Sequence, residues 1–140
     1  RGFALKQHMS HETQYRVYYE DTDAGGIVYY ANFLKFAERG RTELLRSLGF
    51  ENKSLRDERK IGFVVRRVEI DYFRPALLDD LLSVRTDVKA VKSSSLVMAQ
   101  SIFCRNDLLS SMDVVLVCVG EDFKACRMPE DLKTAFEKDS

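Results

Sequence analysis

The 140-residue sequence predicts one α+β domain, in which an antiparallel sheet of five strands curves around a single long helix. Two observations indicate this arrangement. Between residues 32 and 49, apolar residues recur at three- and four-residue spacing, as they do along one face of a helix. Strand-like runs lie on both sides of that segment, and the four that follow it are joined by short turns, which favour antiparallel neighbours. Grouped strands of this kind are typical of an α+β fold, whereas a doubly wound parallel sheet alternates strands with helices.

The first expected element is a strand at residues 13–21, TQYRVYYED, which is rich in aromatic and β-branched residues. The glycines at 25 and 26 interrupt it. The long helix is expected to begin after Asn32 as N-cap and to end at Gly49. Its apolar stripe comprises Phe33, Phe36, Ala37, Gly40, Leu44, Leu45 and Leu48. Since Gly40 lies on this stripe without a side chain, we expect a sheet to approach the helix closely there.

After the helix, residues 54–60 are charged and fit either a short helix or a loop. Four strands are expected at residues 62–73, 81–91, 94–105 and 110–122. The second of these alternates, with one predicted face made of Leu82, Val84, Thr86, Val88 and Ala90. The last is apolar on both faces, as an interior strand is.

One helix covers only one face of a five-stranded sheet. We therefore expect another subunit to cover the outer face or the edges, so that the protein is an oligomer.

The composition argues against several classes of protein. Lys and Arg total 22, as do Asp and Glu, so the net charge is zero, whereas nucleic-acid binders usually carry a basic excess. No apolar run approaches the ~20 residues of a membrane helix. The cysteines, Cys104, Cys118 and Cys126, are odd in number and lack CxxC spacing, which favours free thiols in a reducing compartment such as the cytoplasm over a disulfide or zinc framework.

The sequence does not begin with Met, and Met9 is a candidate natural start. We expect residues 1–11 to be mobile or left over from an expression vector, and the single domain to span residues 12–140. His8 and His11 fall in the first segment and receive no assigned role.

The stretch YYEDTDAGGIVYYANFLKF, residues 18–36, places two aspartates and two glycines just before a helix. Helix N-termini present free N–H groups and a positive partial charge. A carboxylate beside such an end could hold an anion, or could act on a nucleophile while the N–H groups polarise a carbonyl. Asp and Gly are also common in ordinary turns, so a purely structural loop remains an alternative. A metal site is less favoured, because no further acidic or His cluster lies nearby in the sequence.

The segments YYEDTDAGGIVYYANFLKFAERGRTELLRSLG and FVVRRVEIDYFRPALLDDLLSVRT resemble the 4-hydroxybenzoyl-CoA thioesterase family of hotdog-fold proteins, in particular its Tol–Pal-associated acyl-CoA thioesterase subfamily. The resemblance runs from about Tyr15 to about Pro129. It implies the hotdog fold and an enzyme that hydrolyses an acyl-CoA to free acid and CoA without a cofactor. It further implies a dimer or tetramer, located in the cytoplasm and in this subfamily at the inner membrane face.

The resemblance also implies roles for individual residues. Asp23 matches the family's catalytic carboxylate, which acts as general base on water or as nucleophile. The backbone N–H of Tyr30 would hydrogen-bond the thioester oxygen. Gly25 and Gly26 would keep the loop thin enough for the substrate, and Tyr19 would line the site.

Three further points concern the substrate. Lys89 and Lys92, with Arg127, are candidates to meet the phosphates of CoA in a groove between subunits. Many members of the subfamily have His where this chain has Tyr30. Glu38 and Glu43 on the helix are alternative carboxylates, although a position on the solvated or subunit-facing side fits them better.

Two other functions remain compatible with the sequence. One is a non-catalytic module that binds acyl thioesters or an acyl carrier protein; an intact Asp23 favours the enzyme. The other is a hotdog dehydratase, which is less favoured because residues 12–140 contain no His to pair with an acid.

Overall fold

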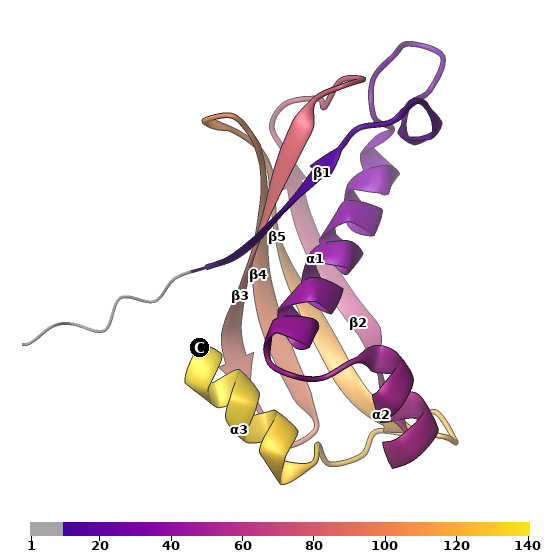
Figure 1. The fold of residues 1–140 in the computed structure, drawn as a ribbon, viewed down its shortest axis with the longest axis vertical. Helices are drawn as coiled ribbons and strands as arrows, with labels where there is room; N and C mark the ends of the chain where they lie inside the picture. Colours follow the sequence, from indigo (N-terminus) through magenta and orange to yellow (C-terminus); the bar gives the residue numbers. More distant parts are fainter. Residues whose placement is uncertain (1–9) are drawn as a thin grey trace, which may run out of the picture.

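The computed structural model describes residues 10–140, which form a five-stranded antiparallel sheet and three α-helices (Figure 1). The strand order across the sheet is β1-β3-β4-β5-β2. The elements in chain order are β1 (His11–Arg16), α1 (Phe33–Ser47), α2 (Asn52–Arg59), β2 (Ile61–Tyr72), β3 (Leu81–Val91), β4 (Ser95–Cys104), β5 (Asp107–Gly120) and α3 (Glu130–Asp139). Two 3-10 turns, Tyr19–Asp21 and Tyr30–Asn32, flank the loop between β1 and α1.

Helix α1 is the helix that the apolar stripe predicts, and its buried residues are Phe33, Phe36, Ala37, Gly40, Leu44 and Leu45. Gly49 follows its end with a φ of +93°, the left-handed conformation that favours glycine after a helix. Asn32 precedes the helix, but its side chain makes no capping bond. The Asn32 side-chain Nδ2 donates instead to the backbone oxygen of Asp21 at 3.0 Å, which ties the start of the helix to the preceding loop.

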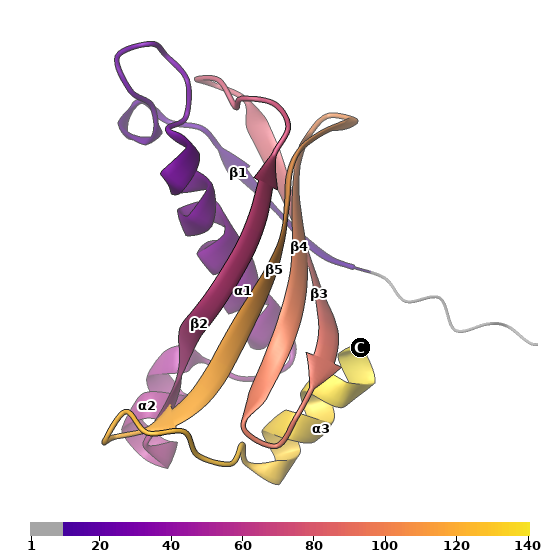
Figure 2. The ribbon, with the colours of Figure 1, turned by 180° about the vertical axis from the view of Figure 1, so that it is seen from behind.

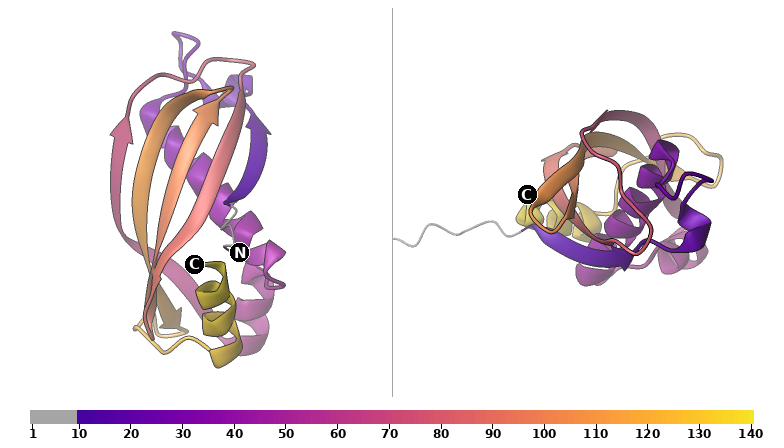
Figure 3. Two further views of the ribbon diagram at one scale, coloured as in Figure 1. Left: turned by 90° about the vertical axis from the view of Figure 1, so that its left-hand side faces the viewer. Right: turned by 90° about the horizontal axis from the view of Figure 1, so that it is seen from above.

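The sheet curves around α1, and the core lies between the helix and the concave face (Figure 3). Gly40 makes the close approach possible, because a Cβ built there would lie 2.6 Å from Val84 Cγ1. Figure 2 shows the outer face of the sheet, over which no helix of residues 10–140 lies. The structure thus leaves exposed the face that we expect a second subunit to cover.

A buried polar group, Gln100 of β4, bridges the sheet and α1 beside Gly40. Its Nε2 donates to the Ala37 backbone oxygen at 2.8 Å and to Thr86 Oγ1 at 3.0 Å. Its Oε1 accepts from Arg41 Nη1 at 3.0 Å. Because both ends of the amide have partners, burying it leaves no polar group unsatisfied.

Two predictions about strands need correction. The first strand ends at Arg16 rather than 21, because residues 19–21 form a 3-10 turn. Ala90 is exposed instead of lying on the buried face, because the register of β3 against β4 shifts between Val88 and Ala90.

The connection between β2 and β3, residues 73–80, is not a turn between neighbours. β2 pairs with β5 and forms one edge of the sheet, whereas β3 pairs with β1 and β4. The chain therefore crosses two strands at this point, although every pairing remains antiparallel as predicted.

Helix α3 is absent from the sequence prediction. It begins after Pro129 with the acidic residues Glu130 and Asp131, and it buries Leu132 and Phe136, which are spaced as on one helical face. These are ordinary helix-start and amphipathic signals, but they span too few turns to stand out.

The N-terminal segment expected to be mobile falls mostly on residues 1–9, which lie outside the described residues. His11 is part of β1, where it pairs with Thr86. Within residues 10–140, no helix is long and apolar enough to cross a membrane.

Candidate active site

Within the loop between β1 and α1, residues 22–28 fold as a small hairpin that presents Asp23. Thr22 pairs with Val28 in an isolated antiparallel bridge, and the Asp23 N–H donates to the Ile27 oxygen at 3.0 Å. The Gly26 N–H donates back to the Asp23 oxygen at 3.0 Å, which closes a tight turn. Gly26 has a φ of +77°, so this turn requires the conformational freedom of glycine.

A second segment, residues 76–78, holds this hairpin from the side. The Val28 N–H donates to the Ala76 oxygen at 2.8 Å, and the Leu78 N–H donates to the Gly26 oxygen at 3.2 Å. Ile27 and Leu77 pair between these two bonds. The position of the hairpin therefore depends on the crossover after β2 as well as on its own sequence.

The two aspartates of Asp21-Thr22-Asp23 have different surroundings. Asp21 Oδ2 accepts from the Tyr18 N–H at 2.8 Å, and the Asp21 backbone oxygen accepts from the Asn32 side chain. Asp21 thus stabilises the loop internally. Asp23 is exposed, and its Oδ1 accepts from the Gly25 N–H at 2.8 Å. Its Oδ2 has no hydrogen-bond partner among residues 10–140 and is available for chemistry.

Asp23 lines an open cleft of about 470 Å³. The other lining residues come from the hairpin, the start of α1 and the end of β2: Ile27, Val28, Tyr29, Tyr30, Phe33, Tyr72, Phe73, Arg74 and Pro75. The cleft therefore places one carboxylate beside a wall of aromatic and other apolar side chains. Such a surface can receive an apolar or aromatic group.

The aromatic rings of the wall contact one another. Tyr29 and Tyr30 have ring centroids 4.7 Å apart, and Tyr30 lies edge-on to Tyr72 at 5.4 Å. The side-chain hydrogen bond with Tyr30 raises the pKa of Tyr29, and burial raises the pKa of Tyr72. Both hydroxyls therefore remain neutral hydrogen-bond donors throughout the neutral range.

Tyr30 begins the 3-10 turn that leads into α1. The first N–H groups of a helical turn have no acceptor within the turn, and the Tyr30 N–H has none elsewhere among residues 10–140.

Of the residues expected from the sequence, Asp23 and Tyr30 line one cleft, and Gly25 contacts Asp23 directly.

The structure does not bring the remaining expected residues to this cleft within one chain. Tyr19 is 79% exposed and is not among the lining residues. Lys89 Nζ binds Asp113 Oδ2 at 2.8 Å, near the end of β3. Lys92 follows in the turn to β4, at the opposite end of the sheet from the hairpin (Figures 1 and 3). Arg127 is exposed in the segment before α3.

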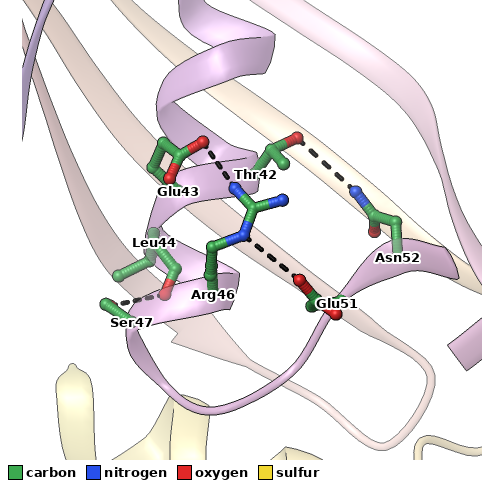
Figure 4. A network of polar contacts seen from close by, with 7 residues as sticks. All are labelled: Thr42, Glu43, Leu44, Arg46, Ser47, Glu51 and Asn52. Carbon is green, nitrogen blue, oxygen red and sulfur yellow. Dashed lines mark hydrogen bonds and ion pairs between the residues drawn. The ribbon is translucent and has the colours of Figure 1, made fainter. Parts of the chain in front are cut away.

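The two alternative carboxylates also lie elsewhere. Glu43 Oε2 accepts from Arg46 Nη1 at 2.6 Å, and Arg46 Nε reaches Glu51 Oε2 at 3.4 Å, so Glu43 helps to fasten the end of α1 to the start of α2 (Figure 4). Glu38 lines a separate cavity of about 140 Å³ beside Arg41. Burial lowers the pKa of Arg41, whose guanidinium faces Gln100.

Sequence reasoning missed the contribution of β2 to the cleft. Tyr72, Phe73 and Arg74 reach it because residues 76–78 bind the hairpin. The run DYFRPA, with exposed aromatics followed by Arg and Pro at a strand end, was the available signal. Within residues 10–140, no three His, Cys, Asp or Glu side chains are grouped to hold a metal ion.

Comparison with known proteins finds one family and many similar chains. The family model described as Thioesterase superfamily matches residues 25–111. A Haemophilus influenzae protein named acyl-CoA thioesterase YbgC is 45% identical over 122 residues, which cover 86% of this chain and 90% of that protein.

Solved structures agree with this finding. A probable thioesterase from Bartonella henselae superposes with a TM-score of 0.84 at 38% identity and covers 86% of this chain and 100% of its own. A variant of 4-hydroxybenzoyl CoA thioesterase, complexed with 4-hydroxybenzoyl CoA, superposes with a TM-score of 0.84 at 22% identity, over 90% of this chain and 97% of its own. At that identity, the second superposition shows a common fold.

Proposed function

This chain belongs to the Thioesterase superfamily, and we propose that it is an acyl-CoA thioester hydrolase whose catalytic carboxylate is Asp23. The expected family and hotdog fold are confirmed by the family match and by the superposed structures. Relatives at 42–45% identity carry the names acyl-CoA thioesterase and acyl-CoA thioester hydrolase. The family match begins at Gly25, so the role of Asp23 rests on the geometry of the hairpin and on the resemblance of its sequence.

The observation that carries the proposal is the arrangement of Asp23 and Tyr30 in one cleft. The Gly25 N–H holds one carboxylate oxygen of Asp23 and leaves the other open to the cleft. The Tyr30 N–H, at the start of a helical turn, supplies a donor for the oxyanion that forms when a thioester carbonyl is attacked. Such a donor stabilises the transition state by about 3–4 kcal/mol.

Two routes use this arrangement. As general base, Asp23 takes a proton from a water molecule whose oxygen adds to the thioester carbonyl, and the CoA thiolate then leaves. As nucleophile, Asp23 attacks the carbonyl itself, the C–S bond breaks with departure of the CoA thiolate, and water hydrolyses the anhydride that results. In both routes Tyr30 acts through its backbone, so its side chain serves the aromatic wall.

The acyl-CoA is larger than the cleft of one chain. The twelve-residue edge strand β2 carries the exposed residues Val64, Val65 and Tyr72, and the exposed Phe73 follows directly after it beside the cleft. Covering this edge with a second copy would bury these side chains and enclose the cleft. Lys89 and Lys92, which lie far from Asp23 in their own chain, would then serve the CoA phosphates of a neighbouring subunit.

The proposed enzyme works as a homodimer or homotetramer in the cytoplasm. Its resemblance to the Tol–Pal-associated subfamily supports a place at the inner membrane face, and acyl groups on an acyl carrier protein are a second candidate substrate.

The test is release of free CoA thiol from short, long and aromatic acyl-CoAs by the wild type and by Asp23→Asn. We expect turnover of at least one substrate, and a loss of about a hundred- to ten-thousand-fold in the variant, the range for a positioned general base. Circular dichroism should show unchanged folding, because the exposed Asp23 side chain contributes little packing.

Two control variants sharpen this result. Tyr30→Phe keeps the backbone donor and should retain most activity, whereas Glu38→Gln should be close to wild type. Full activity in Asp23→Asn together with loss in Glu38→Gln would move the chemistry to α1. If the wild type binds acyl-CoAs but hydrolyses none of them, the hydrolase proposal is wrong, and a non-catalytic module that binds acyl thioesters remains.

A further inference from the structure

The end of β5 and the segment that leads to α3 bring two cysteines together, away from the cleft. Cys118 Sγ and Cys126 Sγ are 3.7 Å apart, although the residues are eight positions apart in sequence. Cys118 is buried, and Cys126 is partly exposed. Neither residue lines the Asp23 cleft.

The backbone fixes this pair as direct cross-strand neighbours. Val119 and Ala125 form an antiparallel bridge, and the Cys126 N–H donates to the Cys118 oxygen at 2.9 Å. Within the loop, the Gly120 N–H donates to the Lys124 oxygen at 3.1 Å. Side chains directly opposite in such a pair have Cβ atoms about 4.5–5.5 Å apart, and a disulfide needs about 3.5–4.5 Å, so the two ranges meet at their common limit.

We propose that Cys118 and Cys126 form a reversible dithiol–disulfide pair that responds to peroxide oxidants. Side-chain adjustment must bring the sulfurs from 3.7 Å to about 2.0 Å, while the backbone pairing already holds the two residues opposite each other. This modification is independent of the proposed hydrolase activity.

The chemistry follows from the different exposure of the two thiols. Cys126, the more accessible residue, releases its thiol proton, and its thiolate attacks one oxygen of the peroxide; the O–O bond breaks, hydroxide leaves and takes up that proton as water, and Cys126 becomes a sulfenic acid. Cys118 sulfur then attacks Cys126 sulfur; the S–S bond forms, the S–O bond breaks, and the hydroxyl leaves with the Cys118 proton as a second water. Two thiols lose two electrons, the peroxide gains them, and a dithiol reductant reverses the reaction.

Burial and the contact with Cys126 support this assignment of roles. Burial, with the contact to Cys126, raises the pKa of Cys118 to about 12, so Cys118 is a protonated thiol at neutral pH and Cys126 is the residue that reacts with peroxide first. Cys104 provides an internal comparison, because it lies opposite Asp107 at the other end of β5 from Cys118.

The link would fasten the segment that carries α3. After Cys126 the chain passes Met128, which is buried and donates its N–H to the Ser93 oxygen at 2.8 Å, and then enters α3. The loop that the disulfide closes contains Gly120 and Phe123, which line a groove of about 430 Å³ beside β2. Oxidation would therefore restrain both the groove wall and the attachment of α3.

The test treats the full chain with hydrogen peroxide, blocks the remaining thiols and maps peptides by mass spectrometry. We expect a peptide pair joined between Cys118 and Cys126, loss of two hydrogen atoms from the intact chain, one free thiol at Cys104, and full reversal by dithiothreitol. The oxidised wild type should also melt at a higher temperature than the reduced protein, because the closed loop restricts the unfolded chain.

Two variants distinguish a specific disulfide between Cys118 and Cys126 from unspecific oxidation of all the cysteines. Cys104→Ser should form the same cross-link, and Cys126→Ser should form none and show no shift in melting temperature. The proposal is overturned if peroxide gives only sulfinic or sulfonic acids, or only intermolecular dimers. It is equally overturned if the cross-link and the stabilisation persist in Cys126→Ser.

Discussion

The loop before α1 and the middle of α1 each place a glycine close to neighbouring side-chain atoms, but the surroundings of the two glycines differ. At Gly25, an added Cβ would lie 3.3 Å from Asp23 Oδ1, an atom on an exposed side chain. At Gly40, it would lie 2.6 Å from Val84 Cγ1 and 3.0 Å from Thr86 Oγ1, both on wholly buried residues. The same added methyl group can be relieved by a small movement in the loop and has no such relief in the core.

The two glycines therefore belong to regions in which different features of the structure are fixed. Around Gly40, packing and the satisfied bonds of Gln100 fix the distance between α1 and the sheet. Around Gly25, single hydrogen bonds fix the direction of one carboxylate. We therefore expect changes in the first region to alter the free energy of unfolding, and changes in the second to alter the rate of hydrolysis.

Gly40→Ala should give the largest effect on stability. Overpacking typically costs about 1–3 kcal/mol, offset in part by the better helix propensity of Ala, about 1 kcal/mol. Urea denaturation should show a lower midpoint with an unchanged slope, and activity per folded molecule should stay close to wild type. Gly62→Ala is the matched control, because a Cβ at Gly62 meets nothing within 4 Å. Equal midpoints for the two variants would contradict the close approach of α1 to the sheet.

Gly25→Ala should give the next largest effect, and it should be catalytic. The new methyl group pushes against Asp23 Oδ1, so we expect a roughly tenfold loss in kcat/KM, about 1.4 kcal/mol, with little change in the free energy of unfolding. Steady-state kinetics and urea denaturation on the same samples measure the two effects. Ala24→Ser, one residue away and exposed, should match the wild type in both. A large loss of stability in Gly25→Ala without loss of rate would reverse the comparison.

Asp131→Asn should give the smallest effect, since it changes a surface contact far from both glycines. Asp131 makes two bonds to the Arg59 guanidinium, at 3.0 and 2.9 Å, which join α3 to α2. The hydrogen bond with Arg59 lowers the pKa of Asp131. A carboxyl with a lowered pKa stabilises the folded state above its ordinary pKa of about 3.9, and this contribution disappears as the pH falls through the lowered value.

Melting temperatures of Asp131→Asn and wild type should therefore differ slightly at neutral pH and low salt, and converge in acid or in high salt. Glu130→Gln, in the same first turn of α3, controls for the effect of charge at a helix start. A difference that persists unchanged in acid would show that the ion pair is not its source.

Much of this fold could be predicted because its signals are local. The stripe from Phe33 to Leu48 specifies α1, and Gly49 marks its end through a backbone conformation that glycine favours. The alternation in β3 is confirmed as far as Val88, where the shift in register begins. The crossover after β2 could not be predicted, because sequence periodicity reports the conformation of a segment and not its neighbours.

The same limit applies to the site. Asp23 lies just before the two loop glycines and the start of α1, where a structural turn is the alternative, and the family resemblance of this segment singles it out. The structure places it in a cleft with Tyr30. The contribution of Tyr72 and Phe73 depends on bonds from residues 76–78 to the hairpin, which no local pattern encodes. The different roles of Asp21 and Asp23 likewise depend on which backbone N–H groups each side chain reaches.

The hairpin that presents Asp23 depends on a second segment of the chain, so residues 18–36 alone do not form the site. Residues 18–36 contain Asp23, Tyr30 and both loop glycines, yet the bonds from Val28 to Ala76 and from Leu78 to Gly26 come from a segment more distant in the chain. A peptide of residues 18–36, or the same stretch grafted onto another scaffold, would lack the partner that fixes its shape. Transplanting the site requires both segments at their native spacing, so the smallest unit that can be engineered is nearly the whole domain.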